Sequence, residues 1–259
     1  DQDNGIIIAD PSDDDQESVA EWFERFCKRM TRNLDRVGYA LCPGDIMASN
    51  PMYRKTLSQW KKQISHITRK PTPKGARWAN VLFDFDTLYG NDALAAEVRR
   101  HILGCLEKSP RLLKMMAEHD AEGKPAIGFF NQLVTTTKDE SGEWIDIKRN
   151  GLRIIADAAR IFALQNGVAT RNTSDRLNAL VRLGKLSDDF ADSVQEAYEA
   201  LLDLLLSHQI AQAKSAKPLN KLIAPDKLSR QSRSTLRVAM RAVKRLQEKL
   251  QDEYATDIF

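Results

Sequence analysis

The sequence lacks several features that mark whole classes of protein. No stretch approaches the roughly 20 apolar residues that a membrane-spanning helix needs, and no basic-then-apolar leader opens the chain. Its three cysteines lie far apart and form no Cys-x-x-Cys pair, which argues against both a disulfide framework and a zinc site. We therefore expect a cytoplasmic protein with no membrane segment.

A large charge imbalance is also missing. The chain has 39 basic and 36 acidic residues, which leaves a net charge of only +3. Proteins that bind nucleic acid normally carry a larger and clustered basic excess. Nucleic acid is therefore not an expected partner, and the charges have to be interpreted locally.

The apolar residues that are present predict a chain in two parts. At 259 residues with 42% hydrophobic content, the chain is long enough for two medium domains. Short β-branched or aromatic runs predict strands at residues 5–9 and 78–90, and amphipathic spacing predicts helices at 12–37, 56–68 and 91–106. From residue 109 the pattern is helical apart from a hairpin or loop at 128–144, with helices expected at 110–120, 151–165, 174–183, 187–213 and 229–254.

Each predicted strand has a pair of carboxylates. Asp1 and Asp3 lie just before the first strand, and Asp84 and Asp86 lie within the second. Residues two apart on a strand point the same way, and such carboxylates suit magnesium, which prefers oxygen ligands and acts in pairs during phosphoryl transfer. The spacing leaves open which of Asp84 and Asp86 completes the site. An Asp-x-Asp pair is also common in proteins without a metal.

Several longer segments resemble a known family. Residues 1–7, 38–51 and 83–85 resemble the nucleotidyltransferase domain of bacterial signalling proteins that also carry cyclic-nucleotide-binding and CBS domains. That domain is similar to the transferase part of the PII-protein uridylyltransferases. Residues 146–152 and 172–177, with His208-Gln209 and Asn220, resemble the helical substrate-binding domain that follows it. The likeness covers nearly the whole chain.

The resemblance implies a fold and an activity. The fold is α+β and mostly helical, with a truncated polymerase-β-like nucleotidyltransferase domain over residues 1–107 and a helical substrate-binding bundle over 108–259. The activity is transfer of a nucleoside monophosphate from a nucleoside triphosphate to an acceptor hydroxyl, on a protein or another molecule, with two Mg²⁺ ions. A Gly-Ser turn that precedes the Asp pair in the family is absent here, so we expect this stretch alone to be inactive.

The resemblance also assigns roles to residues. Asp1, Asp3 and Asp84 would be the catalytic metal ligands, with Asp84 helping to deprotonate the acceptor. Asp86 stands where a basic residue is expected, so either it joins the metal ligands or the triphosphate contacts have changed. Two sets of residues would bind substrate: Asp45, Ser49 and Asn50 in the first domain, and Lys148, Arg149, Asp175, Arg176, His208 and Asn220 in the second.

Some of these substrate-binding assignments have a structural alternative. Asn50 precedes a proline, which is ordinary turn chemistry. Lys148 and Arg149, with the nearby Arg153 and Arg160, have Asp146 and Asp157 close in sequence for local salt bridges. His208 lies late in a long apolar helix, where a histidine is commonly a satisfied structural group.

A further basic stripe lies in the last predicted helix. Its members recur at helical spacing: Arg230, Arg233, Arg237, Arg241 and Lys244. The stripe either meets phosphates or an acidic partner, or is a solvated helix face.

Two alternatives to an enzyme stay open. One is a non-catalytic module that senses a nucleotide and signals to attached CBS or cyclic-nucleotide domains, and the other is a structural helical adaptor. The presence of Asp86 where the family has a basic residue favours the sensor. An adaptor would leave the acids of residues 84–86 unexplained. The nucleotide, the acceptor and the oligomeric state, including a homodimer, stay open.

Overall fold

The computed structural model describes residues 2–140 and 142–255. It is mostly helical with two small sheets, which confirms the expected fold class. The chain divides into two compact units, Asp1–Lys70 with Asp86–Lys108, and Pro71–Phe85 with Ser109–Phe259. No helix within the described residues is both long enough and apolar enough to cross a bilayer.

The first unit is built on a short parallel pair of strands. Ile6 pairs with Arg54, so that β1 (Ile6–Ile8) lies beside β2 (Arg54–Thr56). A capping box between Thr56 and Gln59 starts α2 (Leu57–Arg69), which packs against α4 (Asp92–Leu106). The remaining helical segments are η1 (Asp13–Asp15), α1 (Gln16–Arg36) and η2 (Pro51–Tyr53).

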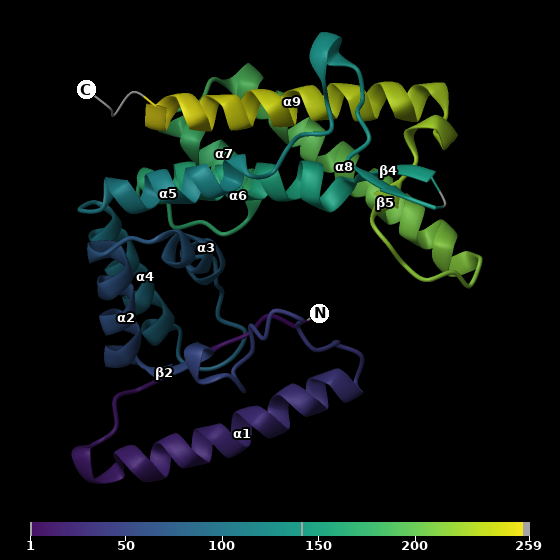
Figure 1. Ribbon diagram of the computed structural model, residues 1–259. Coiled ribbons are helices and arrows are strands. Elements are labelled where there is room, and N and C mark those ends of the chain that lie inside the picture. The colour runs from purple at the N-terminus through teal and green to yellow at the C-terminus, as the bar shows by residue number, and fades with distance from the viewer. Residues whose placement is uncertain (1, 141, 256–259) are drawn as a thin grey trace. The chain divides into compact units, whose positions relative to one another are not determined.

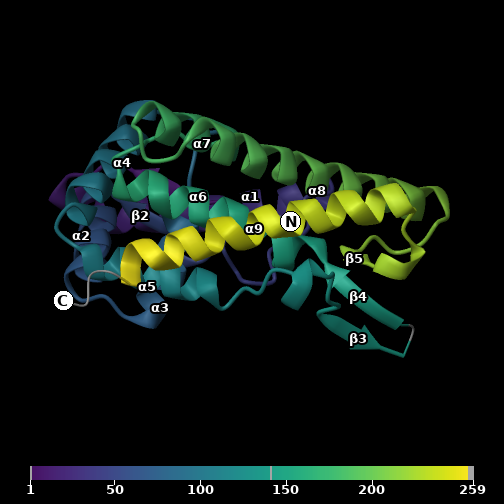
Figure 2. The same cartoon turned by 90° about the horizontal axis from the view of Figure 1, so that it is seen from above.

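The second unit is a helical bundle around α6 (Arg153–Gln165) (Figures 1 and 2). Ile154, Ile155 and Ile161 on α6 are fully buried, which makes this helix the centre of the core. It packs against α5 (Pro110–Ala121), α7 (Thr173–Arg182) and α9 (Arg230–Ala255), while α8 (Asp188–Lys214) runs beside α9. The helix α3 (Pro73–Leu82) packs against α5.

A small antiparallel sheet lies at one end of this bundle (Figure 2). Its strands are β3 (Thr137–Asp139), β4 (Gly142–Asp146) and β5 (Leu222–Ile223). Short helical turns flank it: η3 (Phe129–Asn131), η4 (Lys148–Leu152) and η5 (Pro225–Lys227). Asp146 pairs with Leu222, so the sheet joins the start of α6 to the segment after α8.

The predicted strand at residues 78–90 is wrong. The first part of it belongs to α3, and the remainder forms turns and bends. The side chain of Thr72 accepts a hydrogen bond from the backbone N–H of Gly75, and Pro73 occupies the first helical turn, so a local helix start prevails over the aromatic run. Asp84 and Asp86 therefore do not share one face of a strand.

The segment Pro71–Phe85 lies in the second unit, although we assigned it to the N-terminal domain from the sequence. The chain passes between the units after residues 70, 85 and 108. Asp84 belongs to the helical unit and Asp86 to the first unit.

Candidate functional site

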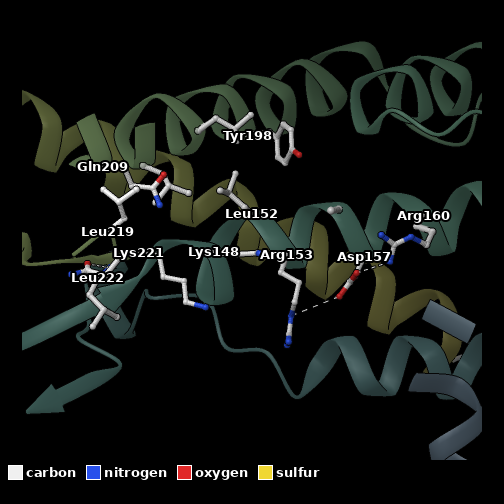
Figure 3. A pocket seen from close by; sticks show the side chains of 14 residues that line it. Lys148, Leu152, Arg153, Asp157, Arg160, Tyr198, Gln209, Leu219, Lys221 and Leu222 are labelled. Atoms are coloured by element: carbon white, nitrogen blue, oxygen red, sulfur yellow. Dashed lines mark hydrogen bonds and ion pairs between the residues drawn. The ribbon is translucent and has the colours of Figure 1, made fainter. Parts of the chain in front are cut away.

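A cavity of about 800 Å³ lies within the helical unit. Its lining comes from η4 and α6, from α8, and from residues 219–222 (Figure 3). These segments are distant in sequence, and they meet because β4 pairs with β5. The cavity therefore depends on the small sheet as well as on the helices.

One wall of the cavity is charged. Arg153, Asp157 and Arg160 are spaced four and three residues apart, which places them on one face of α6. Oδ1 of Asp157 lies 2.7 Å from Nη1 of Arg160, and Oδ2 lies 3.8 Å from Nε of Arg153. Lys148 and Lys221 add two further cations, and Nζ of Lys221 lies 3.7 Å from Oδ2 of Asp146.

The opposite wall is mostly apolar. Tyr198, Leu202, Leu205 and Gln209 recur at helical spacing along α8, so a single face of this helix lines the cavity. Figure 3 shows Tyr198 extending from α8 toward the side where Arg153 and Asp157 lie. The cavity thus places an aromatic and aliphatic surface opposite a set of cations.

The segment before α6 forms a π-helical turn that positions Lys148. The buried carboxylate of Asp146 accepts a hydrogen bond of 2.8 Å from the backbone N–H of Arg149. A Cβ on Gly151 would lie 2.8 Å from Cδ1 of Leu201, so only glycine allows α8 to approach this closely. Turns of this kind recur at functional sites.

The Asp84 carboxylate is held by two guanidinium groups. Its Oδ2 lies 2.7 Å from Nη2 of Arg160, and its Oδ1 lies 2.6 Å from Nη2 of Arg176. Burial is the largest single influence and favours the neutral acid, but the hydrogen bonds and charges of Arg176 and Arg160 outweigh it and lower the pKa of Asp84. This ion-pair network links α6, α7 and the turn after α3.

A second acid in the helical unit has a raised pKa, in contrast to Asp84. Asp120 on α5 is only 3% exposed. Burial, together with the nearby charge of Asp157, raises the pKa of Asp120 to about 7. Nε2 of Gln247 donates to the backbone carbonyls of Asp120 and Gly123 at 3.0 and 2.9 Å, so α9 is tied to the end of α5.

Comparison with models of protein families shows what this unit is. The model described as "Putative nucleotidyltransferase substrate binding domain" matches residues 110–254, more than half of the chain. The chain belongs to this family. A second model, described as "Putative nucleotidyltransferase DUF294", matches residues 1–74. The family expected from the sequence motifs is thereby confirmed, and no curated protein or solved structure matches the chain.

The substrate-binding unit brings together some of the residues that we predicted for it. Lys148 and Asn220 line the cavity, and Nε2 of His208 lies 3.2 Å from Oδ1 of Asn220. Arg176 is buried and contacts Asp84 instead of the cavity. Arg149 and Asp175 are exposed and are not among the lining residues.

The predicted residues of the nucleotidyltransferase part are placed differently. Asp1 lies outside the described residues, and Asp3 is exposed. Nδ2 of Asn50 donates to the backbone oxygen and to Oδ2 of Asp45, and the Asn50 oxygen accepts from the backbone N–H of Met52. The backbone oxygen of Ser49 accepts from Arg54. These contacts stabilise the loop at residues 38–51.

The side-chain amides on either side of Asp3 explain how this loop is held. Gln2 is 6% exposed and donates from Nε2 to the backbone oxygens of Thr31 and Tyr39, both at 3.0 Å. The Asn4 oxygen accepts from the backbone N–H of Ala48 at 2.9 Å. Asp3 is exposed, whereas Gln2 is buried and Asn4 is partly buried. We did not predict this role for Gln2 and Asn4.

The arrangement of acidic side chains bears on the predicted magnesium site. Within residues 2–140 and 142–255, no group of three or more His, Cys, Asp or Glu side chains is placed to hold a metal ion. Both oxygens of Asp84 contact arginines, and Oδ1 of the exposed Asp86 accepts from the backbone N–H of Thr87 at 2.6 Å. The two-magnesium site therefore stays a prediction.

The basic stripe of α9 lies on the outside of the unit. Arg230, Arg233, Arg237 and Arg241 are exposed, whereas Leu236, Met240, Val243, Leu246 and Leu250 are buried. Lys244 forms an ion pair of 3.7 Å with Glu248 on the same helix. This arrangement matches the solvated-face interpretation of the stripe.

Several cavity residues were absent from our predicted substrate-binding set. The sequence offered Arg153 and Arg160 for ligand contacts or for local salt bridges without deciding between the two, and it did not single out Tyr198 or Lys221. The spacing of Tyr198, Leu202, Leu205 and Gln209 was visible in the sequence as one helix face. Nothing local, however, indicated that this face lies opposite the charged face of α6.

Proposed function

We propose that this protein transfers a nucleoside monophosphate from a nucleoside triphosphate to an acceptor hydroxyl, and that the cavity of the helical unit is its substrate site. The observation that carries this proposal is the cavity itself. It lies inside the part of the chain that matches a substrate-binding family, and it places cations opposite an apolar wall. Such a combination suits a small molecule that carries phosphate.

The proposed reaction follows the chemistry of the family. The acceptor hydroxyl oxygen attacks the α-phosphorus of the triphosphate and forms a new P–O bond. The bond from the α-phosphorus to the bridging oxygen breaks, and pyrophosphate leaves with the electron pair. The hydroxyl proton is released to solvent.

A label-transfer assay tests the proposal. The protein at its natural length is incubated with each of the four α-³²P nucleoside triphosphates, magnesium chloride, and candidate protein and small-molecule acceptors. We expect labelled acceptor and an equal amount of pyrophosphate. Absence of both with every triphosphate would contradict transferase activity.

The carboxylate variants then test the predicted metal ligands. Asp3→Asn is expected to reduce transfer by at least about 100-fold if Asp3 is a ligand, because each such interaction contributes several kcal/mol to transition-state stabilisation. Asp35→Asn, at another exposed aspartate of the same unit, is the matched control. If Asp3→Asn turns over as the wild type does, the assignment of Asp3 is wrong.

A second candidate function is nucleotide sensing without catalysis, coupled to attached CBS or cyclic-nucleotide domains. One observation favours it: the Asp84 carboxylate is neutralised by Arg160 and Arg176 and so is engaged in ion pairs. The same assay separates the two functions. A sensor would show saturable binding of one labelled triphosphate and no transfer of label to any acceptor.

A further inference from the structure

Three polar groups that line the cavity between α6 and α8 are accessible to solvent or to a ligand. They are the Lys148 ammonium, the Tyr198 hydroxyl and the Gln209 side-chain amide. Within the described part of the chain, none of these groups has a hydrogen-bond or ion-pair partner. Convergent polar groups of this kind, set in a mostly apolar hollow, are typical of a ligand site.

The charges around the cavity are unbalanced. Four cations line the cavity, and their carboxylate partners are Asp84, Asp146 and Asp157. When Arg176, the second partner of Asp84, is included, this ion-pair network has five cations and three carboxylates, which leaves two positive charges in excess. The cations are Lys148, Arg153, Arg160, Arg176 and Lys221, and the carboxylates are Asp84, Asp146 and Asp157. Asp120 on α5, partly ionised near pH 7, reduces this excess by less than one charge.

The cations differ in how far they are available to a ligand. The Arg160 side chain is only 12% exposed and is engaged by Asp84 and Asp157. The side chains of Arg153 and Lys221 are 44% and 49% exposed, and within residues 2–140 and 142–255 each has a single long ion pair, of 3.8 and 3.7 Å. Lys148, Arg153 and Lys221 are therefore the groups that a ligand would meet.

A phosphate monoester matches this arrangement. It carries about −1.5 to −2 charges at pH 7 and three strong acceptor oxygens, which complements the excess of two positive charges. The single carboxylate among the lining residues, Asp157, is occupied by Arg160 and Arg153. The phosphate would therefore bind through basic side chains, without a protein-held metal ion.

We propose that the cavity binds a small phosphomonoester that carries an apolar or aromatic group. The phosphate lies against Lys148, Arg153 and Lys221. The apolar group lies against Tyr198, Leu202 and Leu205. The volume of about 800 Å³ is within the range of small-molecule sites, so the ligand is a small molecule and not a protein surface. Its role as the acceptor of the nucleotidyl group rests on the function proposed above, whereas its binding does not.

Three probes separate the contributions of the two walls. Phenyl phosphate carries both parts of the proposed ligand, inorganic phosphate only the charged part, and phenol only the aromatic part. In calorimetric titrations of the 259-residue chain, we expect phenyl phosphate to bind once per chain. Inorganic phosphate and phenol should each bind at least about tenfold more weakly, because one wall then has no partner.

Substitutions at the walls test the assignment. Lys148→Ala and Arg153→Ala are each expected to weaken the binding of phenyl phosphate by about tenfold or more, because each removes a charge-assisted hydrogen bond. Tyr198→Ala should weaken the binding of phenyl phosphate and leave the affinity for inorganic phosphate unchanged. Arg149→Ala is the matched control, since Arg149 is the exposed neighbour of Lys148 and does not line the cavity. Thermal melts of each variant check that it is folded.

The proposal is overturned if phenyl phosphate does not bind the folded chain. It is also overturned if phenyl phosphate binds no better than inorganic phosphate, or if Lys148→Ala and Arg149→Ala lose the same affinity. Adenosine monophosphate and ATP with magnesium distinguish the acceptor from the donor. If ATP binds more tightly than the monophosphate and the same variants abolish its binding, the cavity holds the donor triphosphate instead.

The outcomes also separate this inference from the proposed function. Phenyl phosphate binding without label transfer by the natural-length protein would contradict the transferase and leave the ligand class standing. Label transfer to an unphosphorylated protein, without phenyl phosphate binding, would support the transferase and contradict the proposed ligand class.

Discussion

Asp84 has a structural role that can be measured at the level of a single residue. Its carboxylate pairs with Arg160 and Arg176, whose side chains are 12% and 5% exposed. Removing this negative charge leaves two poorly solvated cations facing each other. We therefore expect Asp84→Asn to reduce the free energy of unfolding by about 2–4 kcal/mol, and the melting temperature by roughly 5–15 °C.

The matched control is Asp86→Asn, at the exposed acid two residues later. Differential scanning calorimetry should find its melting temperature close to that of the wild type. If Asp84→Asn melts as the wild type does, the ion pairs do not stabilise the fold, and the predicted metal-binding role of Asp84 gains support.

Asp120 gives the protein a specific dependence on pH. The pKa of its carboxyl rises from 3.8 to about 7 on folding, so the folded state holds this proton more tightly than the unfolded chain does. The resulting stability is complete below about pH 4 and is lost as the pH rises through 7. One pKa unit corresponds to about 1.4 kcal/mol, so the total loss by pH 8 is a few kcal/mol.

Asp120→Asn should remove the loss of stability that ionisation of this carboxyl causes at higher pH. Denaturant unfolding curves at pH 5 and pH 8 are expected to show the variant gaining stability over the wild type at the higher pH. Parallel changes in the two proteins between these pH values would show that Asp120 does not titrate in the folded state.

At the scale of elements, replacing glycine by alanine is expected to have opposite effects on stability in two helical segments. Gly151 lies in η4, where an added Cβ would be 2.8 Å from Cδ1 of Leu201 on α8 and 3.2 Å from Cε of Met240 on α9. Gly104 lies in α4, where an added Cβ would have no atom within 4 Å apart from its chain neighbours and the backbone of its own helix. The same substitution should therefore have opposite signs at the two positions.

We expect Gly151→Ala to destabilise the protein by about 1–3 kcal/mol through overpacking. Gly104→Ala should stabilise it by about 0.5–1 kcal/mol, because alanine favours the helix. Urea unfolding followed by circular dichroism measures both. A stabilising Gly151→Ala would show that α8 and α9 can move away from η4 at little cost.

The elements also show how far the sequence could predict the structure. The helices from α4 onward were predictable because their apolar spacing, caps and glycine stops are local. The segment at residues 78–90 contains two conflicting local signals. The aromatic run at Phe83 and Phe85 favours a strand, whereas the helix start at Thr72-Pro73 favours α3 and prevails.

The candidate site was less predictable than the elements that build it. Lys148 and Asn220 were selected through family resemblance, but Tyr198 and Lys221 were not. The cavity forms only where one face of α8 lies opposite one face of α6 and where β5 returns beside β4. Neither arrangement is encoded in the spacing of any single segment. The same holds for Asp84, whose partners lie 76 and 92 residues away.

At the scale of the whole molecule, the helical unit depends on a segment that is remote in sequence. A chain of residues 109–259 contains every helix of this unit except α3, and it also lacks Asp84. The contact face on α5 and the guanidinium groups of Arg160 and Arg176 would then be left without their partners. We expect this shortened chain to be markedly less stable than the same unit in the whole protein.

A peptide of residues 71–85 should restore part of that stability when added in trans. A ligand that binds only the folded state stabilises it by about 2.7 kcal/mol at 100 times its dissociation constant, so the melting temperature should rise with peptide concentration. The peptide with Asp84→Asn is the control, and it should raise the melting temperature much less at the same concentration. Equal effects of the two peptides would contradict the importance of the ion pairs.

The passage of the chain into and out of the helical unit also sets an order of events during synthesis. Asp84 leaves the ribosome 76 residues before Arg160 and 92 residues before Arg176. At 5–20 residues per second, it waits roughly 4–18 s for these partners. All the elements of the first unit are complete once residue 108 has emerged. The nascent chain can therefore fold its first unit while the turn at Asp84 is still unpaired, and the helical unit closes around that turn only after α7 has been made.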